Sequence, residues 1–136
     1  MVKVIFGNKG MGKTKILIDT ANSFASESQG DVVFIDDSNK LMYELKQNIR
    51  FINVSEFPVK NAEGFLGFIC GIISEDYDID GIFIDGLTYI LKQDAQELLE
   101  FFENIKKISS KYEIKFFFSI NGDTCAIPEY MKEFIM

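Results

Sequence analysis

An eight-residue segment near the N-terminus, residues 7–14, constrains the fold more than any other feature of the sequence. It matches the pattern G-x-x-x-x-G-K-S/T at every fixed position. Glycine allows a backbone to curl until successive N–H groups point toward one anion. We therefore predict that this segment, called the glycine loop below, binds phosphate groups. Its residues are Gly7, Asn8, Lys9, Gly10, Met11, Gly12, Lys13 and Thr14.

The sequence predicts a strand before the glycine loop and a helix after it. Val2–Phe6 is a short apolar run typical of a buried strand. From Lys13 onward the apolar residues recur with the period of a helix, at Leu17, Ala21 and Phe24. Such a helix directs the positive end of its dipole toward a phosphate held by the loop. This strand–loop–helix order is the setting that the motif requires.

Two side chains of the loop indicate a nucleoside triphosphate and a metal ion as ligands. Lys13 has the position of the lysine that reaches the β- and γ-phosphates, and Thr14 has that of the hydroxyl that ligates Mg²⁺. We expect ATP together with Mg²⁺, with Lys13 taking part in catalysis. GTP remains the alternative, because nothing in the sequence selects the base.

Buried strands alternate with helices along the rest of the chain. Near-continuous apolar strands separated by helices are typical of a parallel sheet covered on both faces. We therefore predict a single domain over residues 1–136, an α/β three-layer sandwich with a parallel five-stranded sheet. The expected strands are Val2–Phe6, Val32–Ile35, Phe51–Val54, Ile82–Ile84 and Ile114–Ile120. The expected helices begin at Lys13 and after Ser38, span Ala62–Ser74 and Gln93–Ser110, and close the chain after Pro128.

An aspartate at the end of a later strand is the expected second metal ligand. Proteins with such a loop hold Mg²⁺ with an acid at the end of an apolar strand, and Asp85 directly follows Ile82–Ile84. Asp36 and Asp37 also follow an apolar strand and are the alternatives, although either can instead cap a helix. Asp85 is accordingly our candidate for both catalysis and metal binding, together with Thr14 for the metal.

The choice of Asp85 also predicts the order of the strands. We expect Ile114–Ile120 to lie between Ile82–Ile84 and Val2–Phe6, rather than a direct pairing of the latter two. We further expect Val2–Phe6, the strand that leads into the glycine loop, to be central in the sheet.

The chain resembles the P-loop NTPases over its whole length. The resemblance rests on the segments VKVIFGNKGMGKTKILIDTAN, VVFIDD and GIFIDGL. More narrowly, the chain is similar to a family of short stand-alone bacterial P-loop proteins, sometimes labelled twitching-motility (PilT-like) ATP-binding proteins. The resemblance implies a minimal P-loop NTPase fold and a bound nucleotide, but no pathway.

The residues around Asp85 predict weak catalysis. Many P-loop ATPases place a glutamate directly after this aspartate to position water, whereas here the residue is Gly86. The only arginine is Arg50, which opens a predicted strand and should lie at the end of the sheet opposite the phosphates. We expect slow or partner-dependent hydrolysis, as in a nucleotide-dependent switch. The alternatives are a small nucleotide-dependent kinase and an interaction module that keeps the loop without turnover.

Composition restricts the partners and the compartment. Fourteen basic residues stand against 21 acidic ones, for a net charge of −7, so we expect no nucleic-acid partner. The absence of histidine excludes histidine-based catalysis. The longest apolar stretch, Phe65–Ile73, is shorter than the roughly 20 residues that span a bilayer, and the N-terminus has no signal-peptide pattern. We expect a cytoplasmic protein with no membrane contact, and the broad apolar face of Ala62–Ser74 leaves open a protein partner or a homo-oligomer.

Overall fold

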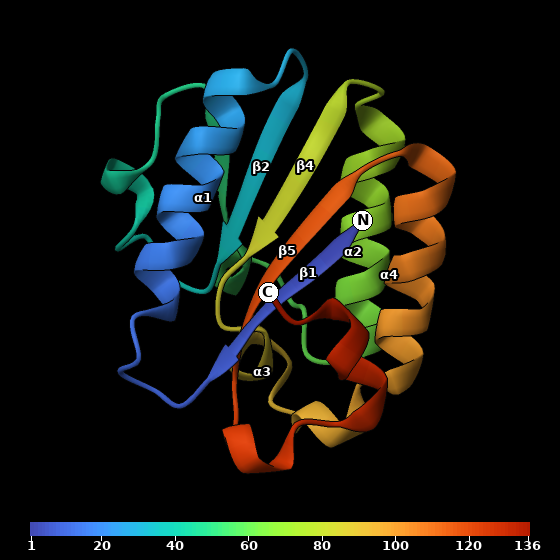
Figure 1. Cartoon of the computed structure of the whole chain (residues 1–136). Helices are drawn as coiled ribbons and strands as arrows, with labels where there is room; N and C mark the ends of the chain where they lie inside the picture. The colour runs from blue at the N-terminus through green and yellow to red at the C-terminus, as the bar shows by residue number, and fades with distance from the viewer.

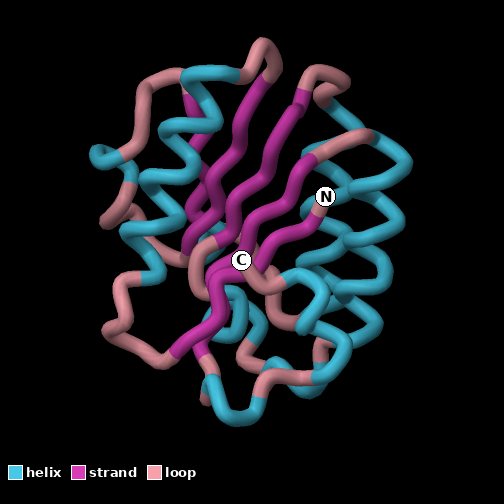
Figure 2. The backbone as a smooth tube through the Cα atoms, viewed as in Figure 1, coloured by secondary structure: helices cyan, strands magenta, loops and turns pink.

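Five parallel strands form one sheet in the order β1-β5-β4-β2-β3 in the computed structural model, which describes residues 1–136 (Figures 1 and 2). All four pairings are parallel, as predicted from the near-continuous apolar runs. The strands are β1 (Val2–Gly7), β2 (Asp31–Asp36), β3 (Ile49–Asn53), β4 (Ile79–Ile84) and β5 (Lys115–Asn121).

Helices cover both faces of this sheet, which confirms the predicted α/β three-layer sandwich (Figure 1). One face carries α1, and the opposite face carries α2 and α4, which contact each other. The short α3 packs against β5 near the carboxyl ends of the strands. The helices are α1 (Lys13–Glu27), α2 (Ala62–Glu75), α3 (Leu87–Leu91) and α4 (Leu99–Tyr112).

The strand order confirms one prediction and corrects another. β5 lies between β1 and β4, as expected with Asp85 at the end of β4. The prediction that β1 is central is wrong, because β1 is an edge strand. The outer edge of β1 is covered by the last two residues of the chain and not by another strand. Ile135 forms an isolated parallel bridge with Val4, and the N–H of Met136 donates to the Val4 carbonyl at 2.9 Å.

A row of phenylalanine rings crosses the face of the sheet beneath α1. Phe51, Phe34, Phe83 and Phe117 occupy matching register positions on four neighbouring strands. Neighbouring rings stack with centroids 4.5–6.3 Å apart. Phe24 of α1 meets Phe83 and Phe117 edge-on, a favoured geometry for aromatic pairs. This row fixes the position of α1, and with it the glycine loop that precedes the helix.

The opposite face carries the larger core. Twenty-five buried residues form one cluster there, contributed by the sheet, α2, α3, α4 and the C-terminal segment. Six of its members are phenylalanines, namely Phe65, Phe101, Phe102, Phe116, Phe118 and Phe134. The phenylalanine-rich composition is therefore used to pack both layers of helices against the strands.

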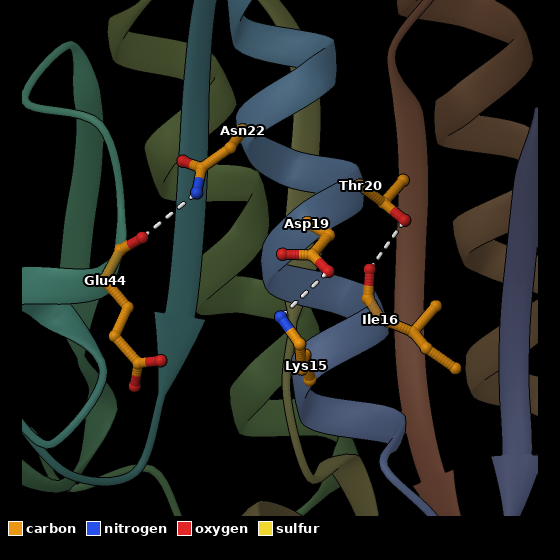
Figure 3. A network of polar contacts seen from close by, with 6 residues as sticks. All are labelled: Lys15, Ile16, Asp19, Thr20, Asn22 and Glu44. Atoms are coloured by element: carbon orange, nitrogen blue, oxygen red, sulfur yellow. Dashed lines mark hydrogen bonds and ion pairs between the residues drawn. The ribbon is translucent and has the colours of Figure 1, made fainter.

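The predicted helix after Ser38 is wrong. Only a 3₁₀ turn, Met42–Glu44, forms between β2 and β3. The Asn22 side chain of α1 donates to the Glu44 carbonyl at 3.0 Å and accepts from the Lys46 N–H at 2.9 Å. These bonds occupy backbone groups that a helix would use itself. Figure 3 shows the first of them on the exposed side of α1, next to the Lys15–Asp19 ion pair.

The predicted helix Gln93–Ser110 is divided into a short 3₁₀ turn and the regular helix α4. Lys92 ends α3 with a left-handed φ of 54°, and a 3₁₀ turn, Ala95–Glu97, follows. The N–H of Asp94 donates to the Glu97 side chain at 3.4 Å, within a capping box that starts the new turn. The regular helix α4 therefore begins only at Leu99. A 3₁₀ helix, Glu129–Phe134, replaces the regular helix expected after Pro128.

None of the helices is long and apolar enough to cross a membrane. The two cysteines, Cys70 and Cys125, are free and exposed.

Candidate functional site

The glycine loop connects the end of β1 to the first turn of α1, as the motif requires. Gly10 and Gly12 have φ values of +89° and +79°, a region that side chains other than glycine rarely adopt. Gly12 is the N-cap of α1 and has no side chain to cap it. The free N–H groups of the first helical turn therefore face the concave side of the loop, where an anion can accept from them.

Lys13 is held inside the loop. It is only 8% exposed, and its ammonium donates to the Asn8 carbonyl at 2.7 Å. Burial lowers the pKa of Lys13, and the nearby Asp85 carboxylate partly offsets this effect. A buried cation with a single carbonyl partner is poorly compensated. Phosphate oxygens brought into the loop would supply the missing negative charge.

Thr14, Asp85 and Ser119 meet although they come from three separate segments. The Thr14 hydroxyl lies 3.2 and 3.1 Å from the two carboxylate oxygens of Asp85. The Ser119 hydroxyl donates to the same carboxylate and accepts from the Gly86 N–H at 2.8 Å. This cluster fixes the Asp85 side chain at the mouth of the glycine loop. The sequence predicted the meeting of Thr14 and Asp85.

A cavity of about 430 Å³ contains this cluster and the inner side of the loop. Its lining consists of Lys9, Gly10, Gly12, Lys13, Thr14, Asp85, Gly86, Tyr89, Ser119 and Asn121. Gly7, Asn8 and Met11, which were also predicted to bind phosphate, belong to the loop but do not line the cavity. Instead the Met11 sulfur accepts from the Asn8 N–H at 3.2 Å, and Met11 is 59% exposed.

Tyr89 is one of the cavity residues that were not predicted as site residues, together with Gly86, Ser119 and Asn121. It lies in α3, whose existence was missed because five residues are too few to show a helical period. Gly86, with a φ of 68°, turns the chain from β4 into α3 and directs Tyr89 to the cavity. The only feature of the sequence that could have indicated Tyr89 as a cavity residue is its position four residues after Asp85.

Asp36, the rival of Asp85, lies at the end of the neighbouring strand. It is 5% exposed, and its carboxylate accepts from the Asp37 N–H at 2.8 Å. Burial raises the pKa of Asp36 to about 7, and the charge of Asp85 adds to the increase. Asp36 neither contacts Thr14 nor lines the cavity. The geometry therefore favours Asp85 as the acid that acts with Thr14.

Arg50 lies at the opposite end of the sheet, as expected. It is near the start of β3 and forms an ion pair at 3.7 Å with Asp76, which precedes β4. The glycine loop lies at the carboxyl ends of the strands, so Arg50 cannot reach a phosphate in the loop of its own chain.

The sequence matches no protein-family model, and a search among curated proteins finds no match. Fold and site geometry therefore carry the functional argument.

Proposed function

We propose that this chain is a P-loop NTPase that binds Mg-ATP in the glycine loop and hydrolyses it slowly or only with a partner. One observation carries the proposal: Thr14 and Asp85, 71 residues apart, converge within hydrogen-bond distance at the mouth of the loop. A hydroxyl from the loop and a carboxylate from a strand end are the two groups that proteins with such a loop use to hold Mg²⁺.

The chemistry of the loop suits a triphosphate. The backbone N–H groups of Gly10, Gly12, Lys13 and Thr14 would bind phosphate oxygens. The Lys13 ammonium would exchange the Asn8 carbonyl for the β- and γ-phosphates. This exchange would leave the buried cation better compensated than it is in the free protein. The acidic net charge does not oppose such binding, because a magnesium complex carries less negative charge than the free nucleotide.

Magnesium also fits the residues present. It prefers oxygen ligands and is usually held by one or two protein side chains plus phosphates and water. The Thr14 hydroxyl and the Asp85 carboxylate would hold it, with Ser119 orienting the carboxylate. When bound, the ion would neutralise charge on the β- and γ-phosphates.

The same geometry argues for slow turnover. Gly86 stands where many relatives of this fold have a water-positioning glutamate, and Arg50 is remote. Additional charge would have to come from a partner protein or a second copy of the chain, which makes a nucleotide-dependent switch the role we propose. We place it in the cytoplasm, because its two exposed cysteines are free, which suits a reducing compartment.

Calorimetric titration with ATP, GTP and ADP, with and without Mg²⁺, tests the proposal. Lys13→Ala should abolish detectable nucleotide binding while the circular dichroism spectrum stays unchanged, because Lys13 acts on phosphate as a charge. The matched control is Lys15→Ala, which removes an exposed lysine of the same helix that pairs only with Asp19. Unchanged affinity in Lys13→Ala, or an equal loss in the control, would contradict the proposal.

A small kinase remains the second candidate, because a further groove adjoins the proposed nucleotide cavity.

A further inference from the structure

A polar groove of about 300 Å³ lies next to the cavity of the glycine loop. The two share Tyr89 and Asn121 as a common wall. The remaining lining of the groove comes from α3 and from the connection to α4, namely Thr88, Lys92, Gln93, Asp94 and Glu97. This groove was not predicted from the sequence, because it depends on α3 and on the 3₁₀ turn Ala95–Glu97, neither of which was expected.

The groove lies on the strand-end side of the nucleotide cavity. That side carries Asp85, Ser119 and Asn121, which face the loop across the cavity. Lys13 and the Thr14–Asp85 pair mark the place of the β- and γ-phosphates. A molecule in the groove would therefore approach the terminal phosphate, and not the base of the nucleotide.

Apart from the capping box, in which Asp94 and Glu97 each accept one backbone N–H, the charged side chains of the groove have no hydrogen-bond or ion-pair partner. The structure contains four ion pairs, and none involves Lys92, Asp94 or Glu97. The backbone that carries them is nevertheless fixed, because Lys92 is the C-cap of α3 and Asp94 and Glu97 form a capping box. Gln93 adds an anchor, since its side-chain oxygen accepts from the Ala62 N–H at 3.1 Å. Two carboxylates against one ammonium favour a ligand that carries a positive charge.

We propose, on the basis of the nucleotide site proposed above, that this groove binds a phosphoryl acceptor, a small molecule with a hydroxyl and an ammonium group. Asp94 and Glu97 hold the ammonium, and the hydroxyl points past Tyr89 and Asn121 toward the terminal phosphate. The hydroxyl oxygen attacks the γ-phosphorus and forms a new P–O bond. The bond between the γ-phosphorus and the bridging oxygen breaks, ADP leaves with its electron pair, and the hydroxyl proton passes to solvent through the open groove.

This assignment also gives a reason for Gly86. A kinase benefits from leaving water unactivated, because a water-positioning glutamate would favour loss of the phosphoryl group to solvent. Gly86 would then limit transfer to water, while the charged side chains of the groove would favour transfer to the acceptor.

The test uses the full chain with Mg-ATP and ethanolamine or L-serine as probes, with glycerol as the uncharged comparison. ³¹P NMR should show a phosphomonoester and stoichiometric ADP with an amine-bearing probe, and little with glycerol. Asp94→Asn and Glu97→Gln should each raise the KM for that probe at least about tenfold. Both substitutions retain the capping geometry, since Asn and Gln serve at the same positions. Calorimetric ATP affinity should stay unchanged in both.

Glu100→Gln is the matched control, because Glu100 is an exposed acid one turn further on and outside the groove. ATP binding without transfer to either amine-bearing probe would overturn the acceptor site and leave the nucleotide site standing. An equal effect of Glu100→Gln, or a loss of ATP affinity in Asp94→Asn and Glu97→Gln, would also overturn it. A wild-type protein that does not bind Mg-ATP would contradict the nucleotide site itself.

Discussion

At the scale of single residues, two acids on neighbouring strands have different environments. Asp85 is hydrogen-bonded by the hydroxyls of Thr14 and Ser119, whereas Asp36 is buried and accepts from one backbone N–H. The sequence predicted both acids at strand ends and favoured Asp85, with Asp36 as an alternative. The choice depends on which strand end faces the loop, and that follows from the insertion of β5 beside β1.

Asp36→Asn should stabilise the protein at alkaline pH. Burial raises the pKa of Asp36 from 3.8 to about 7, so the folded state binds the proton more tightly than the unfolded state. Stability is therefore lost as pH rises from about 4 to about 7. Asparagine imitates the protonated acid and avoids this loss. The advantage of the variant over the wild type should grow by about 2 kcal/mol between pH 5 and pH 8.

Urea unfolding of both proteins at the two pH values, without nucleotide, measures this difference. Asp19→Asn, on the exposed side of α1, is the matched control for the change from aspartate to asparagine. A pH-independent difference for Asp36→Asn would show that Asp36 is ionised in the folded protein across this range.

At the scale of elements, the spacing of apolar residues predicted the five strands and the long helices. The observed ends of these elements differ from the predicted ends by a few residues. This spacing failed where side chains from elsewhere or left-handed residues decide the structure. The turn Met42–Glu44 depends on Asn22 of α1, and α3 ends because Lys92 adopts a positive φ. The predicted central position of β1 was wrong because the four other strands all lie on one side of it, while residues 135 and 136 pair with its outer edge.

Gly81→Ala tests the packing of α1 on the sheet. A Cβ atom at Gly81 of β4 would lie 2.7 Å from the Phe24 ring, too close for van der Waals contact. The substitution should lower the free energy of unfolding by about 1–3 kcal/mol. In a Phe24→Leu background the same substitution should cost clearly less, because the ring that it meets is gone. Equal costs in the two backgrounds, measured by urea unfolding, would contradict this contact.

At the scale of the whole molecule, the sheet separates the only arginine from the proposed nucleotide site. Arg50 and Asp76 pair at the amino ends of the strands, while the loop lies at the carboxyl ends. Within one chain, the positive charge at the proposed phosphate site is limited to lysines such as Lys9 and Lys13, which line the cavity. The sequence predicted this arrangement, because parallel strands place all their carboxyl ends together.

The purified protein should therefore hydrolyse Mg-ATP slowly in the absence of any acceptor or partner, on the order of 10⁻³ s⁻¹ or less, as in switch GTPases without their activators. Phosphate release in a coupled assay measures the rate, with Lys13→Ala as the blank. Turnover of several per second that disappears in Lys13→Ala would show a catalytic group within the chain beyond those described.

The central claim, that Thr14 and Asp85 form the metal end of a nucleotide site, is tested most directly by calorimetry on Asp85→Asn. ATP is titrated into wild type and variant, once with Mg²⁺ and once with a chelator, with Asp36→Asn as the control. Because the carboxylate would act through the ion, Asp85→Asn should weaken Mg-ATP binding at least about tenfold and leave metal-free ATP binding unchanged. An equal loss under both conditions, or no loss in Asp85→Asn together with a loss in Asp36→Asn, would contradict the claim.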